Sequence, residues 1–218
     1  MADIPFELSE DLAQRLRAVI DVEGKIPRAL DALGPLASRR VGFLGVPAGR
    51  LLDTLCAGAA EAAALPIADP LRLDRADASL DAIVSLWSGF RGVDDAALAE
   101  ADRALAPGGR LLVVHDYGRD DVSALADPDA PQYRSWSRRE GPFLRGGAFK
   151  IRVLHCFWTF ESIEDAQAFL GEAFGERGVA AAAGLRRPRL TWNVAVYHRW
   201  RGGVEPEGAV AGGALGVA

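Results

Sequence analysis

The chain has 218 residues, half of them hydrophobic and a quarter charged, which suits one globular domain with a full core. Its formal net charge of -5 disfavours a nucleic-acid partner held by a generally basic surface. No apolar run approaches the ~20 residues that cross a bilayer, and residues 1–20 lack a signal-peptide pattern, so we expect a cytoplasmic protein without a membrane partner. Cys56 and Cys156 belong to no metal-spaced cluster, which predicts reduced thiols and no bound metal.

The first part of the chain predicts helices followed by alternating strands and helices. Ser9 is a typical helix cap before apolar residues at helical spacing, and Gly34 with Pro35 ends the second helix. The Ala- and Leu-rich run that follows the first strand favours a helix by propensity. The expected elements are a helix at 9–22, a helix at 27–33, a strand at 41–45, a helix at 50–64 and a strand at 65–68.

The second part alternates strands and helices more clearly and ends in a long strand. The run 110–115 is continuously apolar, as a parallel strand covered on both faces should be. Residues 118–148 predict irregular structure with at most a short helix. The expected elements are strands at 80–87, 110–115, 151–160 and 191–200 and helices at 94–105 and 163–174. Together they predict one α/β domain over 1–202, with N-terminal helices in 1–36, a doubly wound sheet and a disordered tail at 203–218.

Residues 69–81 have the sequence DPLRLDRADASLD, and residues 99–114 have the sequence AEADRALAPGGRLLVV. These two stretches resemble the class I S-adenosylmethionine (SAM)-dependent methyltransferases of the type 11-like group. The first keeps the register in which the family places an acid, a Leu-Pro pair and Ser-Phe-Asp entering the fourth strand, and the second matches its helix, Pro-Gly-Gly turn and fifth strand. The resemblance covers residues 25–200. It implies a Rossmann-like fold with a mostly parallel sheet and an antiparallel C-terminal strand.

The resemblance implies SAM as cofactor, held by a Gly-rich loop after the first strand. Gly45 and Gly49 match two glycines of that loop, but Phe43 stands where the family has an acid and Pro47 where it has the middle glycine. Phe43 cannot accept a hydrogen bond, and Pro47 removes a backbone donor, so the motif is degenerate. A second reading is that this segment simply turns a strand into a helix.

The segment between Gly49 and Asp81 is too short for the family's full set of elements. Two helices and two strands with connections need roughly 45 residues, and about 32 are present. We therefore expect one strand–helix unit to be missing, so that strand 65–68 lies directly beside strand 41–45. Asp69 is then ambiguous, because its register matches the acid that reads adenine and its spacing from Gly49 matches the acid that binds ribose.

Several residues follow strands that end at the edge where open α/β sheets bind ligands. His115 is a candidate general base for a substrate hydroxyl or amine, with Asp116 to orient it. Ser85 and Trp87, at the end of strand 80–87, are candidates for the cofactor wall, and Tyr117 is a candidate for substrate contact. The competing interpretations are a polar strand end and core packing.

Segment 133–152 interleaves basic and aromatic residues. Trp136, Arg138 and Arg139 belong to it and are candidate lid residues over an anionic ligand, or contacts in a homodimer or with a partner protein. His155 and His198 lie in apolar strands and are expected to be core histidines.

The hypothesis is a SAM-dependent methyltransferase-like protein acting on a small or anionic substrate. The alternative is a non-catalytic interaction or scaffold protein of the same fold that has lost cofactor binding.

Overall fold

The computed structural model describes residues 6–45, 50–68, 70–88, 90, 94–126, 141, 143–145 and 149–205. The helices are α1 (Glu10–Val19), α2 (Lys25–Leu33), α3 (Arg50–Cys56), α4 (Asp95–Ala104) and α6 (Ile163–Ala183), with short 3-10 helices η1 (Val122–Leu125) and η3 (Arg201–Gly203). The strands are β1 (Arg40–Leu44), β2 (Glu61–Leu65), β3 (Leu80–Leu86), β4 (Leu105–Asp116), β5 (Lys150–Thr159) and β6 (Arg189–Trp200).

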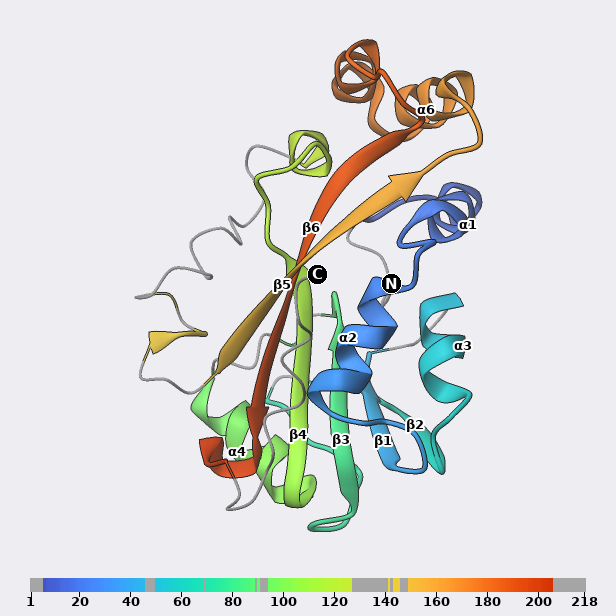
Figure 1. Cartoon of the computed structure of the whole chain (residues 1–218). Coiled ribbons are helices and arrows are strands. Elements are labelled where there is room, and N and C mark those ends of the chain that lie inside the picture. Colours follow the sequence, from blue (N-terminus) through green and yellow to red (C-terminus); the bar gives the residue numbers. More distant parts are fainter. Residues whose placement is uncertain are drawn as a thin grey trace, which may run out of the picture.

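The described strands form one mixed sheet in the order β2-β1-β3-β4-β6-β5. The first four strands in this order are parallel, whereas β6 pairs antiparallel with β4 on one side and with β5 on the other. β5 and β6 extend as a long ribbon beyond the other strands, with α6 at the far end (Figure 1). The strand after α3 pairs directly with β1 and forms the edge of the sheet, which confirms the arrangement that the short segment predicted.

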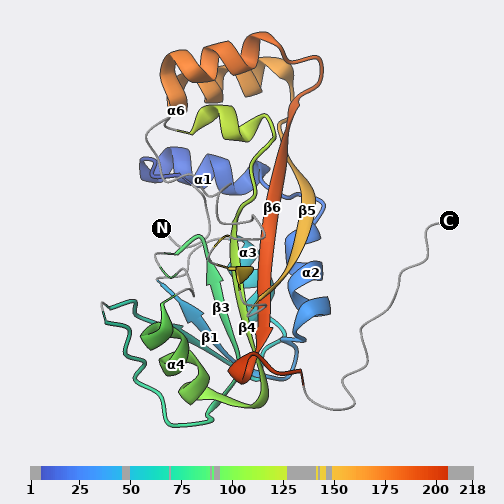
Figure 2. The ribbon, with the colours of Figure 1, turned by 90° about the vertical axis from the view of Figure 1, so that its left-hand side faces the viewer.

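Helices cover the two faces of the sheet unequally. One core contains residues of α1, α2, α3 and α6 packed on alternate positions of the strands. The other face carries α4, the 71–73 segment, and Phe143 and Phe149. Figure 2 shows α1, η1 and α6 stacked above the carboxyl ends of β1 and β3, with α4 beside the lower part of the sheet. The carboxyl edge of the parallel strands is therefore the part of the sheet that α1, η1 and α6 cover.

Most predicted elements are confirmed, and the helix caps explain where they begin. Ser9 Oγ accepts the backbone N–H of Leu12 at the start of α1, and Ser162 Oγ accepts that of Asp165 at the start of α6. Within α6, Gly175 has φ 56° and ψ -134°, so the predicted helix at 163–174 is followed by a second helical stretch after a kink. Among the described residues, no helix is both long enough and apolar enough to cross a membrane.

The prediction of one helix over 50–64 and a strand over 65–68 is wrong. The helix ends at Cys56, and the strand occupies Glu61–Leu65 instead. Helix propensity favoured the alanines at 62–64, but pairing with β1 decides their conformation, since Ala62 to Ala64 lie opposite Val41 to Phe43. The strand predicted at 110–115 is also longer than expected, because the Pro-Gly-Gly segment is already part of β4.

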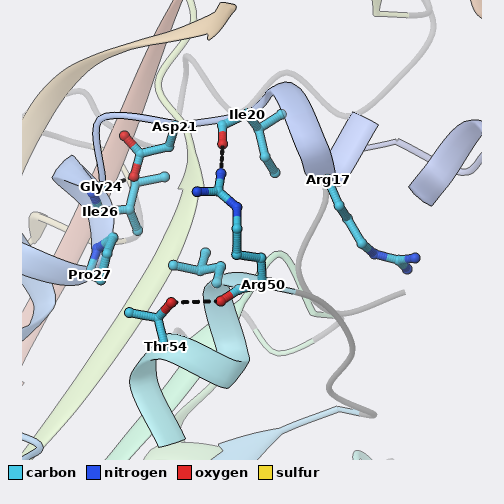
Figure 3. Close-up of a pocket in the computed structure, with 9 residues that line it drawn as sticks. Arg17, Ile20, Asp21, Gly24, Ile26, Pro27, Arg50 and Thr54 are labelled. Atoms are coloured by element: carbon cyan, nitrogen blue, oxygen red, sulfur yellow. Dashed lines mark hydrogen bonds between the residues drawn. The ribbon is translucent and has the colours of Figure 1, made fainter. Parts of the chain in front are cut away.

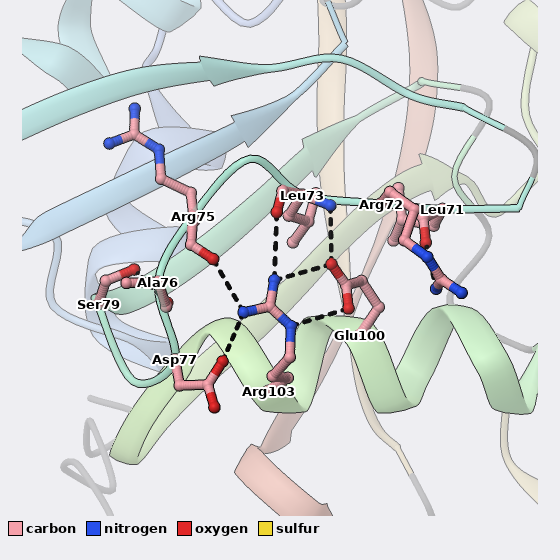
Figure 4. Close-up of polar contacts among 9 residues, drawn as sticks. All are labelled: Leu71, Arg72, Leu73, Arg75, Ala76, Asp77, Ser79, Glu100 and Arg103. Carbon is pink, nitrogen blue, oxygen red and sulfur yellow. Dashed lines mark hydrogen bonds and ion pairs between the residues drawn. The ribbon is translucent and has the colours of Figure 1, made fainter.

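Buried and half-buried ionic side chains fasten the 71–79 segment to α4 (Figure 4). Glu100 Oε1 accepts the backbone N–H of Leu73 at 2.8 Å, and Glu100 also pairs with Arg103. The Arg103 guanidinium donates to the carbonyls of Leu73 and Arg75 and to Asp77. The Arg103 guanidinium and the Leu73 N–H hold the pKa of Glu100 at about 2. The segment that carries the family register is thus held by α4.

We expect Glu100→Gln to lower the free energy of unfolding by about 1–2 kcal/mol at pH 7, because it weakens charge-assisted hydrogen bonds in a buried position. The folded pKa of Glu100 is depressed to about 2, so this stability is present above the ordinary pKa of 4.5 and is lost as the pH falls towards 2. Urea unfolding of both proteins at several pH values measures the difference. Glu172→Gln, which removes the exposed Arg15–Glu172 pair, should cost less than about 0.5 kcal/mol. Equal losses in the two variants would contradict this role of Glu100.

Candidate functional site

The candidate site lies at the carboxyl ends of β1, β3 and β4. Gly45, directly after β1, has φ 95°, a conformation that favours glycine, and its N–H donates to the carbonyl of Leu65 at 2.9 Å. A side chain at Gly45 would therefore strain the backbone, and a glycine here suits a close approach of a ligand. Phe43 in β1 does not contribute to a polar site. It is 3% exposed and packs in the core, so this strand position offers no carboxylate to a ligand.

Trp87 follows β3 in a strained backbone conformation. Its φ of 45° lies in the left-handed region, which costs a non-glycine residue on the order of 1 kcal/mol or more. Its N–H donates to the carbonyl of Val114 in β4, and its indole stacks on Trp192 of β6 with ring centroids 5.3 Å apart. In this backbone conformation the side chain of Trp87 contacts β4 and β6, and the residue is partly exposed.

Asp116 ends β4 between these two indoles. Its Oδ1 accepts the indole N–H of Trp192 at 2.9 Å and that of Trp87 at 3.1 Å. Burial of the carboxylate raises its pKa to about 7, against the lowering effect of both indole donors, and the nearby Asp120 raises it further. Asp116 therefore exchanges a proton near neutral pH, which suits a group that accepts a proton from a substrate.

His115 lies on the opposite face of the sheet from Asp116. It pairs with Ala195 across β6, is 2% exposed, and its ring lies 6.2 Å from that of Phe143. Successive side chains of a strand point to opposite faces, so Asp116 is placed to bind the indoles and not to orient His115. The two side chains lie on opposite faces of β4, so the expected orientation of His115 by Asp116 is not found. Tyr117 begins the next loop and is partly buried. Its backbone N–H donates a hydrogen bond to the carbonyl of Asn193.

Ser85 is fully buried in β3 and stabilises the turn that follows Trp87. Its hydroxyl lies 2.5 Å from that of Ser88, and Ser88 Oγ accepts the N–H of Phe90. These hydrogen bonds support the strained turn. The buried Ser85 hydroxyl therefore acts on the backbone of this turn, and its proposed place in a cofactor wall stays a prediction.

The loop after β4 is bound to the start of β6 by side chains that the sequence analysis did not select. Asp120 accepts the N–H of Asn193, and Asp121 accepts both the N–H and the hydroxyl of Thr191. The Asn193 amide in turn donates to the carbonyls of Gly118 and Arg119. The only sequence signal for this contact was an Asp pair after a strand end, and its partners are about 70 residues away. Trp192 was missed for the same reason.

A small pocket of about 90 Å³ lies next to this edge, between the end of α1, the start of α2 and α3 (Figure 3). Arg50 reaches across it from α3, and its guanidinium donates to the carbonyl of Ile20 at 2.6 Å. Asp21 on its wall accepts the N–H groups of Lys25 and Ile26 and thereby caps α2. Ligand sites for drug-sized molecules are typically about 300–1,000 Å³, so this pocket encloses only part of such a molecule.

The remaining predicted site residues lie outside the described residues. They are Gly49, Asp69, Trp136, Arg138 and Arg139, together with Pro47. From the 133–152 segment, Phe143 and Phe149 are described, and they pack on the sheet: Phe143 is fully buried and stacks on Tyr197 at 3.9 Å. In the described part of the chain, no three His, Cys, Asp or Glu side chains are grouped closely enough to hold a metal ion.

The topology defines the class of protein. Parallel strands with helices on both faces, closed by an antiparallel strand inserted between β4 and β5, form the Rossmann-like fold of the class I methyltransferases. The resemblance seen in residues 25–200 is thus confirmed at the level of the fold.

The sequence is also similar to one methyltransferase. The chain is 35% identical over 139 residues to the demethylmenaquinone methyltransferase of Thermus thermophilus. The aligned segment covers 60% of this chain and 56% of that protein. The chain therefore spans little more than half the length of this relative. No family model matches the chain.

Solved structures with a similar arrangement include two methyltransferases and one enzyme with another activity. A SAM-dependent methyltransferase of Thermotoga maritima is 16% identical, with a TM-score of 0.42 and coverage of 86% of this chain and 92% of that chain. A phosphoethanolamine N-methyltransferase of Haemonchus contortus is 14% identical, with a TM-score of 0.43 and coverage of 84% and 53%. The [4+2]-cyclase SpnF is 14% identical, with a TM-score of 0.41 and coverage of 85% and 82%. Because each TM-score is below 0.5, these likenesses support no conclusion about activity.

We expect Asp116→Asn to stabilise the protein at pH 8 and not at pH 4. The folded pKa of Asp116 is raised to about 7 from 3.8, so its contribution to stability is complete below about pH 4 and is lost as the pH rises through 7. Asparagine keeps an oxygen acceptor for the indoles without the buried charge, so the gain at pH 8 should be about 2 kcal/mol, or roughly 4–8 °C in Tm.

Thermal unfolding between pH 4 and pH 8 measures this difference. Asp74→Asn, at an exposed position, is the matched control for loss of one negative charge. A pH-independent difference between Asp116→Asn and the unmodified protein would contradict a carboxyl group that titrates near neutral pH.

Proposed function

We propose that the protein is a SAM-dependent methyltransferase that acts on a small molecule at the carboxyl edge of β1, β3 and β4. The observation that carries this proposal is the 35% identity over 139 residues with a demethylmenaquinone methyltransferase. It is supported by a strained aromatic residue and a proton-exchanging carboxyl group at the edge of the sheet where this fold binds ligands.

The described residues suit part of the cofactor. Gly45, with its positive φ and no side chain, allows the close backbone approach that the cofactor requires, and the partly exposed Trp87 offers an apolar wall beside it. The small pocket lined by Arg17 and Arg50 adjoins this edge. When bound, SAM supplies a methyl group activated by its sulfonium.

The chain itself supplies positioning and a base. Oδ1 of Asp116 is held by two indole donors, and Oδ2 accepts no hydrogen bond from the residues that the structure describes. A carboxylate fixed in this way, with a pKa near 7, can accept the proton of a substrate hydroxyl or amine at Oδ2. Asp116 is therefore a better candidate for the base than His115, which is buried on the α4 face.

The alternative is a protein of this fold that binds a partner without methyl transfer. Two observations favour it: Phe43 is buried in the core where the family has an acid, and the pocket between α1, α2 and α3 is small. A fold by itself does not determine activity.

Calorimetric titration with SAM and with its demethylated product, S-adenosylhomocysteine, separates the two proposals. The enzyme should bind both with a Kd of roughly 1 mM or tighter. Trp87→Ala should weaken the affinity about tenfold, because it removes the apolar wall. Phe157→Leu, on the far edge strand, is the matched control and should leave the affinity unchanged. Absence of heat with either ligand at millimolar concentration would refute the enzyme and favour the binding protein.

A further inference from the structure

A cluster of basic side chains lies on the sheet far from the carboxyl edge of the parallel strands. It consists of Arg110 at the start of the apolar part of β4, Lys150 and Arg152 at the start of β5, and His198 near the end of β6. We call it the basic cluster. These residues lie beside the middle of β4, whereas Asp116 and Trp87 lie where β4 and β3 end.

The register of the strands brings these side chains to one face. His198 pairs with Lys150 on β5 and with Leu112 on β4, while Arg110 pairs with Trp200. Directly paired residues on neighbouring strands share a face, with Cβ atoms about 5 Å apart, and diagonal neighbours lie about 7–8 Å apart. Lys150 is thus directly beside His198, and Arg110 and Arg152 are its diagonal neighbours. Leu112 belongs to the core beneath α2, which identifies the face.

Polar atoms in this cluster lack hydrogen-bond partners. Arg110 Nε and His198 Nδ1 are buried without a partner among the described residues. The Arg110 guanidinium stacks on the ring of Trp200 at 3.1 Å, and the end of α2 at Gly34 packs on its aliphatic part. Buried polar groups are nearly always satisfied, so the Arg110 N–H donor and the His198 ring nitrogen are candidates to bind a ligand.

The charge of the cluster is unbalanced. Glu205 raises the pKa of Arg110 and of His198 against the stronger lowering effects, and it pairs with Lys150 at 2.7 Å on the exposed side. Three cations and one carboxylate leave two excess positive charges, although the chain as a whole carries -5. Burial and the cations Arg110, Lys150 and Arg152 lower the pKa of His198 to about 4, against a small opposing effect of Glu205. His198 is therefore neutral at pH 7.

We propose that the basic cluster is a binding site for a phosphate-type dianion, held by Arg110 and Arg152 with His198 between them. The guanidinium donors match the oxygens of a phosphate group, and two excess positive charges match a dianion. His198 Nδ1 can donate to the anion in the tautomer that carries a hydrogen there, or after the ring is protonated in the presence of the anion. Nothing in the proposed methyl transfer uses these residues, so the two proposals can fail independently.

The histidine resonances provide a direct test, because the chain has three histidines. In the full chain at pH 7.5, addition of about 10 mM inorganic phosphate should produce a saturable shift of the His198 ring signals relative to chloride at equal ionic strength. In sulfate, which stays a dianion in acid, the pKa of His198 should rise by about one unit or more from its value in chloride.

Two variants make the test specific. Arg152→Gln, at an exposed position of β5, should weaken phosphate binding about tenfold, and Arg110→Met should weaken it further. Arg189→Gln is the matched control, since Arg189 stacks on Phe157 at the other end of the same ribbon and should leave phosphate binding unchanged. Because Arg152 is exposed, its variant is expected to fold even if Arg110→Met does not.

The outcomes distinguish the source of the anion. Equal shifts with inorganic phosphate and with glycerol phosphate support a site for free phosphate, and a stronger response to the ester supports a site for a phosphorylated metabolite. A His198 signal that responds to phosphate no more than to chloride, or that responds identically in Arg152→Gln, would overturn the proposal.

Discussion

The antiparallel insertion of β6 between β4 and β5 is the constraint on which the rest of the structure depends. A parallel sheet of four strands would leave β4 as an exposed edge, with its backbone donors and acceptors unpaired. β6 satisfies that edge and in turn carries β5. It also spans the whole height of the sheet, so a single strand contributes Trp192 to one end and His198 with Trp200 to the other.

At the carboxyl edge, β6 makes possible an arrangement that is unfavourable by itself. Trp87 is held in a left-handed backbone conformation and the carboxyl group of Asp116 is partly desolvated, and each costs folding free energy. The two indole donors, the stacking of Trp87 on Trp192 and the side-chain bonds from Asp120 and Asp121 to β6 offset part of that cost. Concentration of strain and of a perturbed pKa at one edge is characteristic of functional sites.

The other end of β6 has the opposite electrostatic character. There Arg110 Nε and His198 Nδ1 are buried beside other cations without a hydrogen-bond partner among the described residues. The chain is acidic overall, so this local excess of positive charge arises from the strand register, because the four residues come from three different strands.

Much of the fold could be read from local signals in the sequence. Ser9 and Ser162 marked helix starts, Gly34 marked a helix end, and continuous apolar runs marked buried strands, because caps and periodicity act over a few residues. The short segment before Asp81 even indicated that β2 would lie directly beside β1. Ala62 to Ala64 were assigned to a helix because their intrinsic preference is helical, and only pairing with Val41 to Phe43 makes them a strand.

The sequence alone predicted the location of the candidate site, at the polar end of the apolar strand that carries His115 and Asp116. Which of these neighbours faces the indoles was decided by the tertiary structure, because the face of a strand residue depends on its register with β6. The same holds for Trp192, which lies about 75 residues from Asp116 in the chain and 2.9 Å from it in the fold. Local sequence determines which segments are strands and helices; contacts between distant segments decide which side chains meet, because only the assembled sheet brings them within hydrogen-bonding distance.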